Sequence, residues 1–141
     1  MIQRIQSVWL LLAACAAFLT LQFPFYNGNM VDANNVKHIQ ELTAKSQLLL
    51  LILTAGEGLA ALIAIFLFKN RKMQFRITLI TFLVSLINLV LLFLQTKQYV
   101  PGEGTYTLTA VFAIIVPVFL ILAMRGIRRD DKLVKSLDRL R

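Results

Sequence analysis

The 141-residue sequence contains one cysteine and one histidine, and only 16% of its residues are charged. An average soluble domain has about a quarter of its residues charged. A single cysteine excludes a disulfide framework, and one cysteine with one histidine excludes a zinc or iron–sulfur site built by this chain alone. The sequence also lacks a phosphate-binding glycine-rich loop and a serine–histidine–acid arrangement. We therefore expect no catalytic residue, no metal, no cofactor and no enzymatic activity.

Apolar residues, in contrast, make up 58% of the chain, and the mean hydropathy is +0.73. A soluble fold of this size cannot bury so much apolar surface, and the same excess excludes disorder. A helix needs about 20 apolar residues to cross a bilayer, and four runs qualify, at residues 7–25, 46–68, 77–95 and 107–124. They are continuous rather than alternating, which favours helices over strands. The predicted fold class is an all-α integral membrane protein, with an up-down bundle of four transmembrane helices in residues 1–125.

The basic residues orient these spans. The loop between the second and third runs contains Lys69, Arg71, Lys72 and Arg76 without an acidic residue, whereas the other two loops are neutral. The segment after Met124 contains seven basic and three acidic residues. Because basic loops stay in the cytoplasm, we predict that both termini are cytoplasmic. The net charge of +8 then reflects membrane topology, and nucleic acid is not an expected partner.

The first run raises the question of a cleavable signal. Leu12-Ala13-Ala14-Cys15 resembles the site at which bacterial lipoprotein signals are cut before a cysteine. The apolar run, however, continues past Cys15 to Phe25, whereas a mature lipoprotein normally begins with a polar tether. We expect a retained first span.

One acidic residue, Glu57, lies at the centre of the second run, where a charge costs about 2.5–3.5 kcal/mol. Asn88 lies at the same depth in the third run, on a polar helix face with Thr78, Thr81 and Ser85. We predict a hydrogen bond between Glu57 and Asn88 inside the bundle. The functional alternative is that Glu57 acts as a proton site.

Small residues predict where membrane helices approach closely. Gly56, Ala60 and Ala64 recur at a spacing of four in the second run, and Ala13 and Ala17 do so in the first. We expect these two stripes to pack against each other.

The loop before the second span and the tail both suggest additional helix. Asp32 resembles a helix N-cap, so we expect the second span to begin early or to follow a short interfacial helix. Residues 126–141 predict a basic, amphipathic cytoplasmic helix, which could lie on anionic lipid or contact a protein partner. The basic residues predicted to serve this binding are Lys69, Arg71, Lys72, Arg128, Arg129, Lys132, Lys135 and Arg139.

Three segments carry a resemblance to a known family: residues 1–7 (MIQRIQS), 68–74 (FKNRKMQ) and 125–141 (RGIRRDDKLVKSLDRLR). Over essentially its whole length, the chain resembles a family of small bacterial four-span proteins known as domain of unknown function 4293. The resemblance implies a multi-pass protein of the bacterial cytoplasmic (inner) membrane. It supplies no catalytic residue to carry over.

Together, these observations favour a non-enzymatic accessory or scaffold subunit whose cytoplasmic face binds a protein partner or anionic lipid. The alternative is a small proton-coupled transporter that acts as a homo-oligomer through Glu57. The sequence does not determine the oligomeric state.

Overall fold

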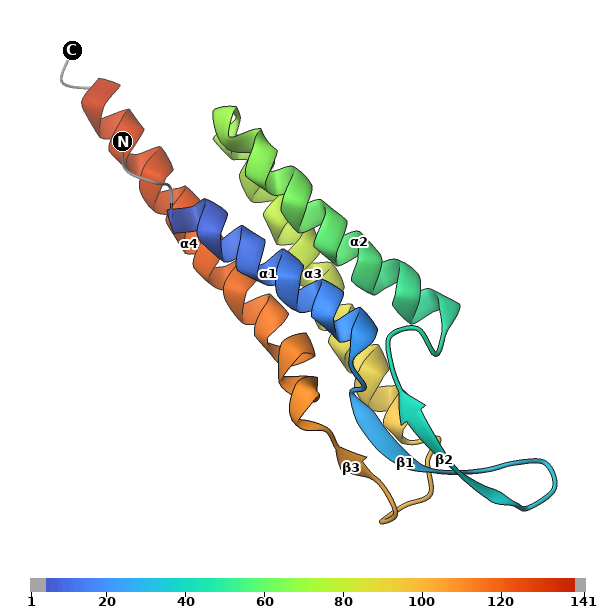
Figure 1. The fold of residues 1–141 in the computed structure, drawn as a ribbon. Coiled ribbons are helices and arrows are strands. Elements are labelled where there is room, and N and C mark those ends of the chain that lie inside the picture. The colour runs from blue at the N-terminus through green and yellow to red at the C-terminus, as the bar shows by residue number, and fades with distance from the viewer. Residues whose placement is uncertain (1–4, 139–141) are drawn as a thin grey trace.

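The computed structural model describes residues 5–138 as four antiparallel helices with a small sheet at one end (Figure 1). The helices are α1 (Ile5–Gln22), α2 (Leu48–Phe66), α3 (Arg71–Thr96) and α4 (Val111–Asp138), with short 3-10 turns at Leu67–Lys69 (η1) and Leu108–Ala110 (η2). Each of the four apolar runs has become a helix long and apolar enough to cross a membrane. The mostly helical fold with four helices of spanning length, as predicted from the sequence, is therefore confirmed, and it suggests a multi-pass membrane protein.

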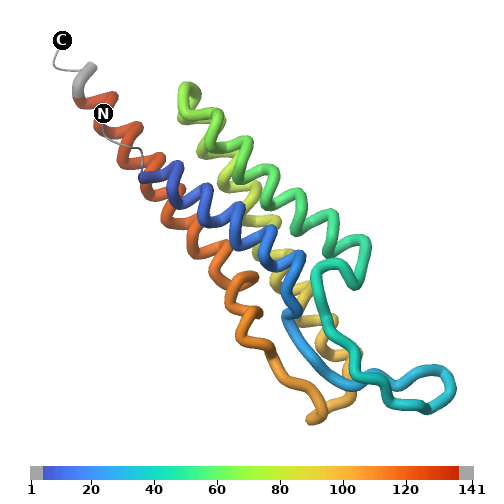
Figure 2. Tube along the Cα trace, in the orientation of Figure 1, coloured from blue at the N-terminus to red at the C-terminus, as the bar shows by residue number. Residues whose placement is uncertain are grey.

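The helices form a ring in which α1 contacts α2 and α4, while α3 contacts the same two helices from the other side. Figure 2 shows the start of α1, the turn between α2 and α3 and the last turns of α4 at one end of the bundle. We call this the basic end, because it contains Arg71, Lys72 and Arg128, and we call the opposite end the sheet end. Both basic segments of the sequence thus lie together, as the predicted topology requires.

The sheet end contains three short strands that the sequence analysis missed. Strands β1 (Tyr26–Val31) and β2 (Lys37–Leu42) form a hairpin, and β3 (Thr105–Tyr106) pairs with the other edge of β1. The helix expected to start at Asp32 is wrong, because Asp32 begins the hairpin turn. Its carboxylate accepts a hydrogen bond from the Ala33 backbone at 2.8 Å, and Asn35 has a positive φ of 57°. An aspartate makes the same local hydrogen bond in a turn as at the start of a helix. Because of the three strands, the predicted all-α class is corrected to mostly helical.

Aromatic rings hold the sheet onto the helices. The Tyr26 ring lies edge-on to Tyr99 and Tyr106, and Phe25 lies edge-on to Tyr106 and Phe93 of α3. A Cβ atom on Gly104 would overlap the Tyr26 ring. The strand register therefore depends on a close approach between this ring and the backbone, which only glycine permits.

At the basic end, α4 continues without interruption from the fourth span into the basic tail (Figure 1). Gly126 contacts Gln6 near the start of α1, so the residues after it extend past α1. The helix has no break between residues 125 and 126, where the sequence analysis separates the transmembrane domain from the tail. Of the residues predicted to bind a partner or lipid, Arg139 lies outside the described part of the chain.

Candidate functional site

Helix α3 faces the bundle interior with polar residues, which we call the polar seam. These residues are buried, at most 4% exposed, and follow the helix in steps of four and three: Gln74, Thr78, Thr81, Ser85 and Asn88. The three hydroxyl groups donate to carbonyls of α3 itself at 2.7–2.9 Å. Their oxygen lone pairs remain on the inner face, so the seam presents hydrogen-bond acceptors to the interior.

We call the end of the seam at Asn88 its deep end and the end at Gln74 its shallow end. The buried acid Glu57 of α2, 4% exposed, faces the deep end. The Asn88 side-chain amide lies near the Glu57 carboxyl, but its hydrogen bond at 2.9 Å goes to the Thr54 hydroxyl. Thr54 in turn donates to the carbonyl of Leu50. Glu57 Oε1 and Asn88 Oδ1 are both buried without a partner among residues 5–138. The predicted Glu57–Asn88 pair are neighbours, yet they share the site with Thr54, which lies on the same helix face as Glu57 and could have been found by its i, i+3 spacing.

The shallow end of the seam contains two buried amides. Gln74 Nε2 donates to the carbonyl of Ala64 at 2.9 Å. Gln74 Oε1 and both polar side-chain atoms of Gln6 are buried and unpartnered within the part of the chain that the structure describes. Sequence reasoning missed Gln6, because a single glutamine near the start of an apolar run is typical of a residue at the end of a membrane span. Its position against Gly126 makes it an interior residue instead.

Beyond Asn88, toward the sheet end, the interior becomes apolar. The next inward residue of α3 is Leu92, which is 1% exposed. It belongs to a buried cluster that also includes Leu50 of α2 and Phe25. The seam therefore runs from the basic end to Glu57 and Asn88, where a layer of apolar side chains ends it.

The predicted small-residue stripes meet only in part. Ala13, Ala17 and Ala64 lie in one buried cluster. Gly56 is exposed and a Cβ atom there would meet nothing within 4 Å, so its predicted packing role is wrong, and Ala60 is only half-buried. The close approach is made at Gly58, where a Cβ atom would lie 2.8 Å from the ring of Phe18. The reason is angular: Gly58 lies four residues after Thr54 and three before Ala61, on the buried face of α2, whereas Gly56 lies on the face of the exposed Ile52 and Leu59.

At the basic end, the first turns of α3 and the last turns of α4 enclose a cleft of about 280 Å³, which we call the basic cleft. It collects five of the eight basic residues predicted to bind a partner or lipid, together with one acid and two apolar residues. The lining residues are Arg71, Lys72, Phe75, Ile127, Arg128, Asp131, Lys132 and Lys135. Lys69 and Arg129 are exposed but do not line it.

Contacts between α3 and α4 shape this cleft. The Arg71 guanidinium donates to the carbonyl of Asp130 at 2.7 Å, and the Arg128 guanidinium lies 4.7 Å from the centre of the Phe75 ring. Lys135 binds Asp131 at 2.6 Å, and this hydrogen bond holds the pKa of Asp131 below its usual range. The cleft is therefore net positive even though its acid stays ionised. Backbone, ring and carboxylate hold three of its cations in place, which preorganises them for an anion.

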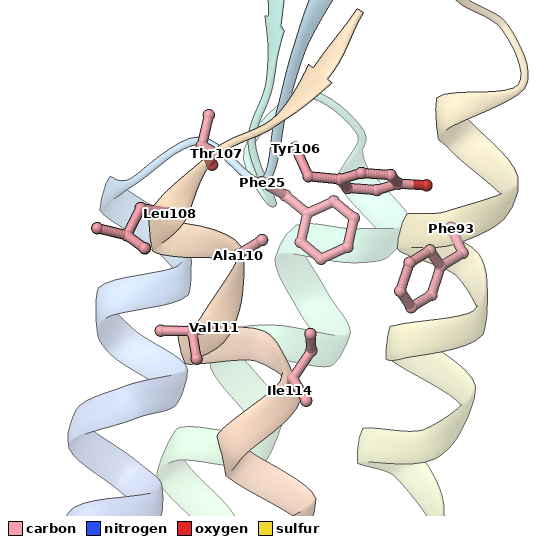
Figure 3. Close-up of a pocket in the computed structure, with 8 residues that line it drawn as sticks. All are labelled: Phe25, Phe93, Tyr106, Thr107, Leu108, Ala110, Val111 and Ile114. Atoms are coloured by element: carbon pink, nitrogen blue, oxygen red, sulfur yellow. The ribbon is translucent and has the colours of Figure 1, made fainter.

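A larger cavity of about 630 Å³ lies at the sheet end, between α3 and the start of α4 (Figure 3). Figure 3 shows the rings of Phe25, Tyr106 and Phe93 grouped around one space, with Ile114 below them, and each of the three rings contacts the other two. The wall is almost entirely apolar, and the hydroxyl of Thr107 donates to the carbonyl of Pro24. Such a wall offers hydrophobic contact, with the hydroxyl groups of Tyr106 and Thr107 as its polar side-chain groups.

Comparison with known proteins places the chain in a family. Residues 2–140 match the family described as Domain of unknown function (DUF4293), so the chain belongs to that family. This confirms the resemblance drawn from the terminal and loop segments. No curated protein and no solved structure matches the chain.

Proposed function

We propose that this protein is a non-enzymatic accessory or scaffold protein of the bacterial cytoplasmic membrane, with its basic end in the cytoplasm. The basic end would bind the headgroup of an anionic phospholipid. The observation that carries the proposal is the basic cleft, in which five cations and one carboxylate surround a space of about 280 Å³.

The position of the cleft favours a lipid headgroup. It lies where α3 begins and where α4 leaves the bundle, which is the depth of the headgroups if the four helices span a bilayer. Phe75 and Ile127 give it an apolar wall below the cations. Beyond it, Leu133 and Val134 are 56% and 40% exposed between basic residues of α4, on the part of this unbroken helix that projects from the bundle.

Two other functions compete with this one. A protein partner could use the same cations and the exposed apolar residues of α4. A small proton-coupled transporter using Glu57 is favoured by one observation, the buried carboxyl oxygen without a partner. Against transport of a larger substrate, Glu57 lines neither the basic cleft nor the cavity at the sheet end.

Native mass spectrometry of the full chain, extracted in mild detergent and titrated with phosphatidylglycerol or phosphatidylcholine, tests the lipid proposal. The variant Lys72→Gln/Lys132→Gln removes two cations from the cleft. The matched control Lys69→Gln/Arg129→Gln removes two cations outside it. We expect the cleft variant to weaken phosphatidylglycerol binding by roughly 30-fold, from about 1 kcal/mol per basic residue, and the control to weaken it much less.

The proposal is overturned if both variants lose the same affinity, because surface charge alone would then account for binding. It is also overturned if the protein does not prefer phosphatidylglycerol to phosphatidylcholine. If the cleft variant instead loses a co-purifying protein while its lipid binding is unchanged, the basic cleft is a protein-binding site.

A further inference from the structure

The bundle interior contains five buried polar atoms that have no partner in the described chain: Nε2 and Oε1 of Gln6, Oε1 of Gln74, Oε1 of Glu57 and Oδ1 of Asn88. In a membrane interior, an unpaired polar atom is costly and is rarely left so. Their side chains occupy two places on the bundle interior, the shallow end of the polar seam and its deep end.

At the deep end, what is missing is a hydrogen-bond donor. The Asn88 amide donates one of its two N–H groups to Thr54, and the Thr54 hydroxyl donates to Leu50, so one N–H group of the amide is left for the remaining acceptors. Two acceptors, Glu57 Oε1 and Asn88 Oδ1, remain. No basic residue on the surrounding parts of the helices can neutralise the acid. The sequence has no lysine, arginine or histidine in α1 (5–22), in α2 (48–66), in residues 77–96 of α3 or in residues 111–124 of α4. A proton from solution supplies what these side chains lack.

The two ends of the bundle differ in the side chains that lie between them and Glu57. From the basic end, Gln74, Thr78, Thr81 and Ser85 lead to Asn88 with acceptor atoms on the inner face. From the sheet end, Leu92, Leu50 and Phe25 close the interior, each at most 1% exposed. Water enters a buried site only where polar groups can receive it, so the seam offers partners for water on the route from the basic end, whereas the packed apolar side chains at the sheet end offer none.

We propose that Glu57 is a reversible proton-binding site that exchanges with the basic end through the polar seam and is sealed from the sheet end. On binding, a hydronium ion in the seam gives its proton to the Glu57 carboxylate and becomes water. The neutral carboxyl group then donates to an acceptor such as Asn88 Oδ1. On release, the proton returns to water, and the Asn88 amide stabilises the carboxylate. The site does not depend on lipid binding in the basic cleft.

The first test uses dicyclohexylcarbodiimide, an apolar reagent that reacts with protonated carboxyl groups in apolar surroundings. The full chain is reconstituted into vesicles of phosphatidylethanolamine and phosphatidylglycerol, treated at a series of pH values, digested and analysed by mass spectrometry. We expect labelling at Glu57 that falls about tenfold for each pH unit above its midpoint, as the protonated fraction does. Glu41 and Glu103 in the loops are internal controls and should stay unlabelled, as should position 57 in Glu57→Gln.

The second test establishes the side of access. Vesicles with the basic end outside are separated from those with the sheet end outside, and the external pH is stepped before a short labelling pulse. We expect labelling to follow the external pH only when the basic end faces outward. Ser85→Leu should slow this response, whereas the control Leu92→Ala, on the sealed side, should leave access from the basic end intact.

Two results overturn the proposal. One is the absence of Glu57 labelling at every pH in the wild-type protein, which would show that the carboxyl does not take up a proton. The other is an equal response to pH steps on the two sides, which would show that the seam is not the route. Both results come from the wild-type protein, so they hold even if Ser85→Leu fails to fold.

Discussion

Asn88 of α3 donates its side-chain amide to the Thr54 hydroxyl of α2 at 2.9 Å. Nearer the sheet end, Gln95 of α3 donates to Gln47, next to the start of α2, at 2.8 Å. In a bilayer, apolar side chains gain little by meeting one another rather than lipid, so such bonds contribute strongly to the choice of helix partner. These two bonds fix the register between α2 and α3, and thereby place Glu57 opposite the polar seam.

The interhelical bond should be measurable by substitution. Asn88→Ala should lower the free energy of unfolding by about 1 kcal/mol, within the range found for hydrogen bonds between membrane helices. Ser85→Ala is the control, because the Ser85 hydroxyl donates to Phe82 of its own helix and joins no second helix. Unfolding in a detergent titration would measure both. Equal losses would show that the Asn88 bond does not hold α2 to α3.

The two glycines that flank Glu57 should respond to substitution in opposite ways. Gly58→Ala places a Cβ atom 2.8 Å from the Phe18 ring, so the ring must move, and we expect a loss of about 1 kcal/mol. Gly56→Ala meets nothing within 4 Å and should gain up to about 1 kcal/mol in helix propensity. In a Phe18→Ala background, the cost of Gly58→Ala should vanish. If it persists there, the close approach between α1 and α2 is not its cause.

The loop network at the sheet end should depend on pH. Glu103 accepts hydrogen bonds from Lys37 and Asn29, and these bonds lower its pKa from the ordinary value of 4.5. Since the folded state has the lower pKa, the network adds stability above pH 4.5, and this is lost as the pH falls through the lowered value. Carboxyl titration by NMR should show the shift, and Lys37→Gln should move the pKa of Glu103 upward. An unchanged pKa in that variant would contradict the pairing.

The acid in the basic cleft should oppose anion binding. Asp131→Asn removes the cleft's only carboxylate and releases Lys135 from its ion pair. We expect binding to anionic vesicles to tighten by roughly fivefold, from about 1 kcal/mol per unit of charge at the surface, and to become more sensitive to salt. Co-sedimentation with vesicles at two ionic strengths measures this. Asp130→Asn is the control, because Asp130 does not line the cleft.

The sequence by itself determined the helical scaffold and which basic segments share one end of the bundle. Continuous apolar runs of this length form helices in a bilayer whatever their neighbours do, because the backbone must satisfy its own hydrogen bonds there. The spacing of Thr78, Thr81, Ser85 and Asn88 placed them on one face, which the structure buries. The distribution of basic residues anticipated that Arg71 and Arg128 would lie at one end, where they line the basic cleft.

Only the tertiary structure decided which residues meet. Thr54 rather than Glu57 takes the 2.9 Å bond from Asn88, and Gly58 rather than Gly56 makes the close approach to α1, because the rotation of α2 about its axis depends on all of its neighbours at once. The hairpin replaced the expected helix after Asp32 because strand pairing and the rings of Tyr26, Tyr99 and Tyr106 outweigh a local preference at the helix start. Local spacing specifies a face, but the orientation of that face is the result of packing across the whole bundle.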